Sequence, residues 1–276
     1  MKVHSLGEVN SDSPGKQFLP KEDAKLPLTE HLTELRKRIL ISVAALFIVF
    51  LLIFNYSEQL FNLLTFPLKA EMKIDSVRPY IHLRDKAAPP LVFFAVAEAF
   101  WMHLKVSFVA AFILSLPVIL YQLWNFIAPG LLEREKKYVV PFVFSSTLLF
   151  LTGALFCFLV VLPFAITFLL GYKTSSFTPM LSVEKYIDFC LKFILAFGAI
   201  FELPLVILFL TRFGIVSPKT LARHRKYAVL FSFIAAAILT PTPDAFNQVL
   251  MAVPIIILYE IGILLSIIIY RKKKNA

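Results

Sequence analysis

The sequence predicts an all-α, multi-pass membrane protein with six transmembrane helices. Hydrophobic residues make up 59% of the 276 residues, a share that is too high for a soluble globular domain. These residues also occur in long uncharged runs, such as the 27 residues of Val106–Leu132. About 20 apolar residues are enough to cross a hydrocarbon layer, so several runs of this chain qualify as membrane spans.

Four spans are expected before residue 212, and each ends at charged or interfacial residues. Their approximate ranges are 39–56, 106–125, 141–162 and 186–211.

The run from Tyr227 to Tyr270 is long enough for two more helices, and only Asp244 and Glu260 within it are charged. Pro241 and Pro243 divide it, because two prolines so close together cannot lie inside a helix. We expect these prolines and Asp244 to form a tight hairpin. The fifth helix is then short, at about 21 Å, and the sixth is expected to be short as well.

The distribution of basic residues predicts which way the spans face. Six spans place both ends of the chain on one side of the membrane. Of the 28 Lys and Arg residues, 19 then fall on that side and 9 on the other. Because Lys and Arg are in excess in cytoplasmic segments, the orientation is N-in, C-in.

The net charge of +10 comes from basic residues at the edges of apolar segments, which favours an anionic inner leaflet over nucleic acid as partner. Cys157 and Cys190 lie in or beside apolar segments and are expected to be buried thiols without a disulfide. No signal peptide is recognised. We expect residues 1–25 to be a flexible cytoplasmic tail, 26–271 a single membrane domain and 272–276 a basic cytoplasmic tail.

Two acidic residues are expected to lie deep in the membrane. Glu202 is about 15 Å of helix from Arg212, and an ionised carboxylate there would cost several kcal/mol. We therefore expect it to be protonated, hydrogen-bonded or facing a polar cavity. A functional role is the default for such residues, with packing by a hydrogen bond as the alternative. Glu260 lies at a similar depth counted from Arg271, and function and packing stay equally open for it.

Two further segments carry charge in an informative pattern. The segment 26–40, LPLTEHLTELRKRIL, has leucines at helical spacing, which by itself predicts an interfacial helix with cations at its edge. The loop 133–137, EREKK, contains two acids where a cytoplasmic loop needs only basic residues, so we expect it to bind a cation. Metal, phosphate-binding and nucleophile motifs are absent, so neither an enzyme nor a cofactor or metal site is expected.

Several blocks, in this order, resemble the TatC family, the receptor subunit of the twin-arginine protein translocase. The motif His-Leu-x-Glu-Leu-Arg-x-Arg matches at 31–38, and the second helix and following loop match at 98–137. FGAIFELP, at 197–204, is similar to the fourth helix of the family with its buried glutamate. Two further blocks are similar to its last two helices, namely the Thr-Pro and Pro-Asp-Ala-Phe-Asn-Gln hairpin at 240–248 and LYEIG at 258–262. The resemblance covers about 26–271.

The resemblance implies a receptor that binds signal peptides with paired arginines and helps to move folded proteins outward, using the proton gradient. It implies TatA- and TatB-type single-span partners in a hetero-oligomer with several copies, in the inner (cytoplasmic) membrane of a bacterium. The recognition acids of the family map onto Glu34 and Glu135, with Phe126 at the loop entrance and Leu35 and Arg36 in the matching motif. Local charge adds Glu30 and Glu133. The residues expected to line a partner-docking surface are Glu202, Thr240, Gln248 and Glu260.

The alternative class is a secondary transporter or channel for a small solute, with Glu202 as the ion-coupling residue. Such a transporter would be expected to have paired broken helices and an internal repeat. It would not need acids in a cytoplasmic loop. We find no repeat in the sequence, which favours the translocase hypothesis.

Overall fold

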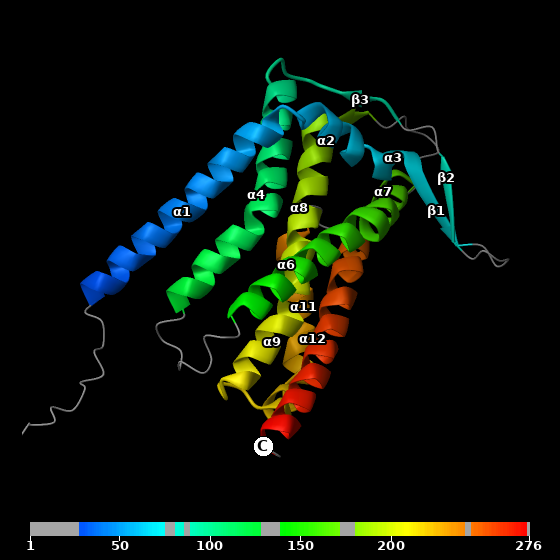
Figure 1. Ribbon diagram of the computed structural model, residues 1–276. Helices are drawn as coiled ribbons and strands as arrows, with labels where there is room; N and C mark the ends of the chain where they lie inside the picture. The colour runs from blue at the N-terminus through cyan, green and yellow to red at the C-terminus, as the bar shows by residue number, and fades with distance from the viewer. Residues whose placement is uncertain are drawn as a thin grey trace, which may run out of the picture.

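The computed structural model describes residues 28–74, 81–85, 89–127, 139–171, 180–240 and 244–274. Long helices dominate it, and α1 begins and α12 ends at the same end of the molecule (Figure 1). Five helical segments are long and apolar enough to cross a membrane, which confirms the expected helical membrane class. The expected tail at 1–25 and the hairpin prolines Pro241 and Pro243 lie outside the described residues.

The first span, α1 (Leu28–Phe54), is continuous with the N-terminal motif and packs chiefly along α4 (Glu98–Ile127). Its remaining surface is exposed, as expected for a helix that faces lipid (Figure 1). Small elements that the sequence analysis did not predict join the two helices at the other end of the molecule. They are α2 (Ser57–Leu64), α3 (Phe66–Lys69), the antiparallel strands β1 (Ala70–Ile74) and β2 (Ile81–Asp85), and β3 (Leu91–Val92).

The third span is longer than expected. It runs through α6 (Val139–Phe156), a π-helical turn η2 (Cys157–Val161) and α7 (Leu162–Gly171). Pro163 follows the π turn and cannot donate a main-chain hydrogen bond, which loosens the regular helical pattern at this point. The span therefore continues through a local irregularity instead of ending at residue 162.

The fourth span is broken into two helices. After the short strand β4 (Leu181–Ser182), which pairs in parallel with β3, α8 (Val183–Phe201) is followed by α9 (Leu203–Arg212). Glu202 occupies the turn between them, and Pro204 lies at the start of α9. Since proline lacks an N–H and its ring crowds the preceding turn, the break places the glutamate at the joint.

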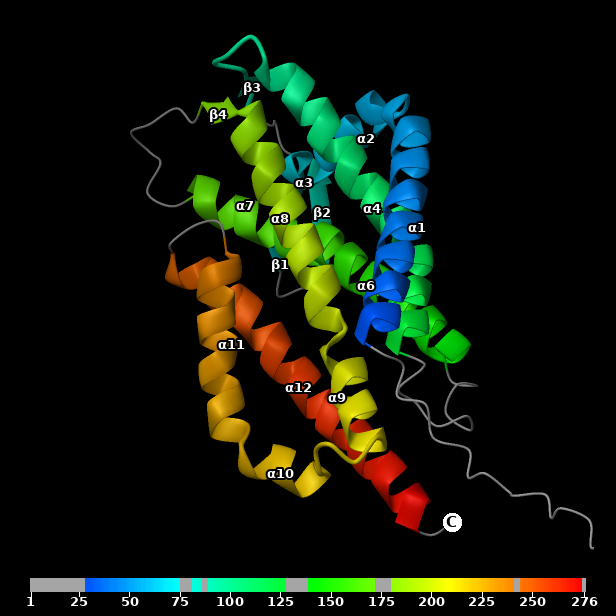
Figure 2. The same ribbon diagram turned by 90° about the vertical axis from the view of Figure 1, so that its left-hand side faces the viewer.

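The last two helices differ in length. Beyond α10 (Pro218–Arg223), α11 (Arg225–Leu239) has 15 residues, which at about 22 Å confirms a short fifth helix. The expected short sixth helix is wrong, because α12 (Ala245–Lys274) has 30 residues. Its Pro254 is accommodated, as often happens in membrane helices. Figure 2 shows α12 running obliquely from α11 at its start to α9 at its end.

The core lies where α6 packs on α8. A Cβ atom added to Gly153 would lie 2.5 Å from the main-chain oxygen of Phe197, and one added to Gly198 would lie 2.5 Å from the ring of Phe150. Small residues let membrane helices approach closely. Here main-chain or ring atoms of the opposite helix occupy the space beside each glycine. Cys157 and Cys190 are free and fully buried, as expected of packing thiols.

We expect Gly153→Ala to destabilise the protein, because the methyl group must displace backbone of α8 rather than a flexible side chain. Overpacking of this kind typically costs about 1–3 kcal/mol. Thermal unfolding of the purified protein in detergent measures the loss. Gly171→Ala is the matched control, since nothing lies within 4 Å of its added Cβ. Equal midpoints for the two variants would contradict this packing.

Candidate functional site

Three side chains form a polar network where the first turns of α1 meet the last turns of α4. Arg38 donates from Nη2 to Oε1 of Glu34 at 3.0 Å and from Nη1 to Oε1 of Gln122 at 3.1 Å. Gln122 is buried, with 8% of its surface exposed. The arginine therefore joins a carboxylate on α1 to an amide on α4.

The other expected recognition residues surround this network only in part. Leu35 is half-buried, Arg36 is exposed, and Phe126 is half-buried in the last turns of α4. The Glu30 side chain and the whole of 128–138, with Glu133 and Glu135, lie outside the described residues. The chain enters that loop directly after α4, so it leaves the helix close to the Arg38 network.

An aromatic cluster packs beneath the same end of the molecule. The ring of Trp124 lies 5.0 Å from that of Phe142 and 4.8 Å from that of Phe209, centroid to centroid. The last two rings are 5.7 Å apart. Rings at these distances and tilts attract one another beyond their buried area. The cluster therefore fixes α4, α6 and α9 relative to each other.

Glu202, at the joint between α8 and α9, is held by α6. Ser146 donates its hydroxyl hydrogen to Oε2 of Glu202 at 2.7 Å. The second oxygen, Oε1, is buried and has no hydrogen-bond partner among the described residues. Ser146 itself is 5% exposed. Among the described residues, one oxygen of the carboxyl group thus has a hydrogen-bond partner and the other has none.

The remaining expected docking residues make contacts of their own. Thr240, the residue that follows α11, donates its hydroxyl hydrogen to the main-chain oxygen of Ala236 in that helix. Gln248 donates from Nε2 to the main-chain oxygen of Phe233, which joins α12 to α11. Among the described residues, neither side chain forms a hydrogen bond with Glu202.

Glu260 forms an ion pair with Arg225 at 2.8 Å. This places Glu260 beside the first residue of α11. The later turns of α12 pack on α9, where Gly262 lies against Pro204 and Ile207. The pair therefore closes the open end of the α11–α12 hairpin.

A cavity of about 550 Å³ lies between α9, α11 and α12. Leu203, which follows Glu202, and Tyr259, which precedes Glu260, both line it. Its wall on α11 is largely apolar and includes the exposed rings of Tyr227 and Phe231. The lining of the cavity thus combines apolar side chains with residues that adjoin Glu202 and Glu260 in the sequence.

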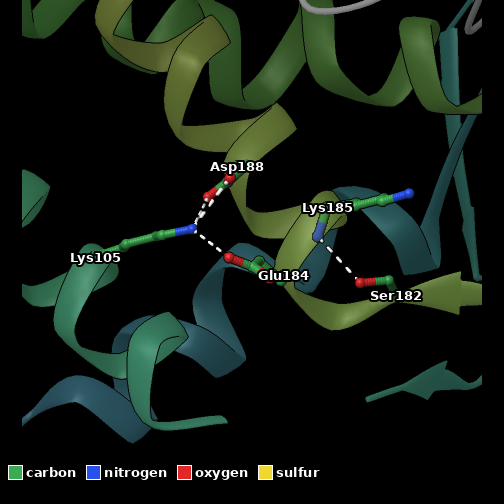
Figure 3. A network of polar contacts seen from close by, with 5 residues as sticks. All are labelled: Lys105, Ser182, Glu184, Lys185 and Asp188. Carbon is green, nitrogen blue, oxygen red and sulfur yellow. Dashed lines mark hydrogen bonds and ion pairs between the residues drawn. The ribbon is translucent and has the colours of Figure 1, made fainter. Parts of the chain in front are cut away.

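A second charged cluster joins the early turns of α4 and α8 (Figure 3). Lys105 of α4 donates from Nζ to Glu184 at 2.7 Å and to the two oxygens of Asp188 at 2.9 and 3.1 Å. Both acids belong to α8, whose first turn is capped by the Ser182 side chain. All three charged side chains are about one-third exposed, and the cluster clamps α4 to α8.

The sequence analysis missed Arg38 as a contact residue, and also Gln122, Ser146 and the Lys105 cluster. The first three of these had a signal in the sequence. Arg38 belongs to the matching N-terminal motif, Gln122 is a polar residue near the end of an apolar run, and Ser146 belongs to a Ser-Ser-Thr run within an apolar segment. Within the described ranges, no group of three or more His, Cys, Asp or Glu side chains is arranged to hold a metal ion.

Comparison with known proteins identifies the family. The family model described as Sec-independent protein translocase protein (TatC) matches residues 30–254. The TatC protein of Desulforapulum autotrophicum is 39% identical over 258 residues, covering 94% of this chain and 90% of its own. That of Aquifex aeolicus is 40% identical over 252 residues, covering 91% and 98%.

Solved structures agree with these sequence matches. A crystal structure of the twin-arginine translocase receptor TatC superposes with a TM-score of 0.71 at 38% identity, covering 87% of this chain and 99% of that one. A second structure of this receptor, in DDM, gives a TM-score of 0.72 at 39% identity, with 86% and 99% covered. The chain belongs to the TatC family of Sec-independent protein translocase proteins.

Proposed function

We propose that this protein is the membrane receptor and core subunit of a twin-arginine translocase in the inner membrane of a bacterium. It recognises signal peptides with paired arginines and moves folded proteins outward, driven by the proton gradient. The single observation that carries the proposal is the Glu34 carboxylate, held beside the end of α4 by Arg38 and Gln122. Residues 26–271 form the membrane domain, with cytoplasmic tails at 1–25 and 272–276.

The chemistry of the ligand supports this assignment. Guanidinium groups bind carboxylates through charge-assisted hydrogen bonds of fixed geometry. Glu34 supplies one carboxylate, and Glu135 supplies another from the loop that follows α4. Glu30 and Glu133 add negative charge to the same region. Leu35 and Phe126 provide apolar contact for the peptide. Arg36 belongs to the same motif as Glu34.

The partner-docking surface is proposed along α9, α11 and α12. The groove there is bordered by the residues next to Glu202 and Glu260. The buried, unpaired Oε1 atom of Glu202 is suited to accept a hydrogen bond from the helix of a TatA- or TatB-type single-span partner. Thr240 and Gln248 extend the polar positions toward the α11–α12 hairpin. Several copies of receptor and partners then assemble as a hetero-oligomer.

We expect Glu135→Ala and Glu135→Lys to abolish export of a reporter with a twin-arginine signal peptide. The lost carboxylate removes a partner for a guanidinium, and lysine repels it. Export is measured by fractionation, and accumulation of the variants in the membrane by blotting. Glu22→Ala, in the N-terminal tail, controls for the loss of one acidic residue. Normal export by the Glu135→Ala variant at ordinary expression would refute its role.

Glu34→Ala should weaken binding of the same signal peptide. If Glu34 and Glu135 bind one arginine pair, the double variant should lose less binding free energy than the sum of the two single variants, because residues that share a ligand are not independent. Crosslinking yield at graded peptide concentration measures the three losses. Strictly additive losses would indicate two separate sites.

Glu202→Gln should retain much of the export activity, because an amide oxygen can accept the same hydrogen bonds as a protonated carboxyl group. Glu202→Ala should weaken partner docking, and Glu202→Lys should disrupt it. Ser146→Ala, which removes one internal donor to Glu202, should have a milder effect. An export assay with blotted protein levels compares the four variants. Activity as low for Gln as for Ala would instead favour proton coupling at this residue.

A further inference from the structure

Arg38 differs from the other cations of the N-terminal motif in how it is held. Its guanidinium binds two helices at once, through Nη2 to Glu34 and through Nη1 to Gln122. Nε is buried and has no hydrogen-bond partner among the described residues. Lys37, the next residue in the chain, is exposed. The fold thus fixes the guanidinium of Arg38 between two helices, which a cation that only interacts with lipid headgroups would not require.

Stability alone does not explain the contact. The Arg38 and Glu34 side chains are 27% and 26% exposed, and partly exposed ion pairs contribute little to folding. Their spacing of four residues, with the acid first, favours the pair within α1. The second hydrogen bond of the guanidinium, from Nη1 to the buried Gln122, does not follow from this spacing. It fixes the guanidinium against α4.

We infer that Arg38 is the positioning residue for the recognition carboxylate of Glu34. It occupies Oε1 of Glu34 and leaves Oε2 to accept a hydrogen bond from an arginine of the signal peptide. Through Gln122 it also sets the distance between this carboxylate and the end of α4, where the loop with Glu135 begins. The inference rests on the proposed function, because it concerns the same peptide-binding site.

Two physical features support positioning over competition with the ligand. Arg38 engages only one oxygen of Glu34, and Arg38 is the only hydrogen-bonding partner that the described residues give this carboxylate. Its other branch, to Gln122, holds it back from the second oxygen. A carboxylate fixed before the peptide arrives loses less side-chain entropy on binding, so the affinity is higher. Arginine alone provides the planar fork, since the lysine ammonium is a point charge.

The experiment measures binding of a synthetic signal peptide with paired arginines, and of its paired-lysine analogue, to the full-length protein in lipid nanodiscs. Arg38→Gln should weaken binding of the arginine peptide about tenfold, a typical size for coupled neighbours. The preference for arginine over lysine should shrink as well. Lys37→Gln removes the same charge one residue away and should bind like the wild type. Unchanged or tighter binding by Arg38→Gln would overturn the inference.

A background variant separates positioning from a general effect on structure. In Glu34→Gln protein, the further change Arg38→Gln should cost almost nothing, since the carboxylate it positions is gone. An equal loss in both backgrounds would mean that Arg38 acts independently of Glu34, and the inference would fail. Wild-type protein without preference for paired arginines, or full binding by Glu34→Gln, would instead refute the proposed function.

Arg38→Lys serves where Arg38→Gln does not accumulate. The lysine keeps the charge and one bond to Glu34 but cannot reach Gln122 at the same time. We expect an affinity between those of the wild type and Arg38→Gln, and the thermal unfolding midpoint checks that the variant is folded. Wild-type affinity for this variant would show that the fork is not required and would overturn the inference.

Discussion

Helices in a hydrocarbon layer gain little hydrophobic free energy from packing apolar side chains against each other, because lipid tails are equally apolar. A polar group that enters the layer must instead find its partner within the protein. This constraint governs how the spans of this chain are joined. Lys105 binds the acids of α8, Ser146 binds Glu202, and Arg225 binds Glu260. Each contact joins two segments that are far apart in the sequence.

The close packing of α6 on α8 depends on the same condition. Without glycine at 153 and 198, the helices could not approach closely enough for Ser146 to reach Glu202 at the joint of the fourth span. Glu202 then differs from the other pairs in one respect. Its second oxygen is buried without a partner among the described residues. A buried acceptor left in this state costs free energy, which a donor from a docking helix would recover.

The sequence alone was sufficient for the helical membrane class and the order of the long helices, because uncharged runs of this length are not found in soluble domains. The predicted number of six spans stays a prediction, since five described helical segments are long and apolar enough to cross a membrane. The sequence also located the break between α11 and α12 from two prolines. It failed for the length of α12, although the apolar run Ala245–Tyr270 is itself 26 residues long. The Arg38–Gln122 contact joins residues 84 positions apart. Hydrophobic patterns do not encode such a pairing, although the polar residue near the end of α4 marked one side of it.

The end of the molecule where Arg38 joins α1 to α4 and the carboxyl group of Glu202 are connected by continuous packing. Trp124 of α4 contacts both Phe142 and Phe209. Ser146 lies one turn beyond Phe142 on α6, and Glu202 lies two turns before Phe209. This continuous packing connects the two sites, but energetic coupling between them also requires an element that can adopt two conformations. The joint at Glu202 is suited to that role, because proline at the start of α9 removes a main-chain hydrogen bond that would otherwise resist bending. A shift of the last turn of α4 would then reach the Ser146 hydrogen bond before it reached the rest of the fourth span.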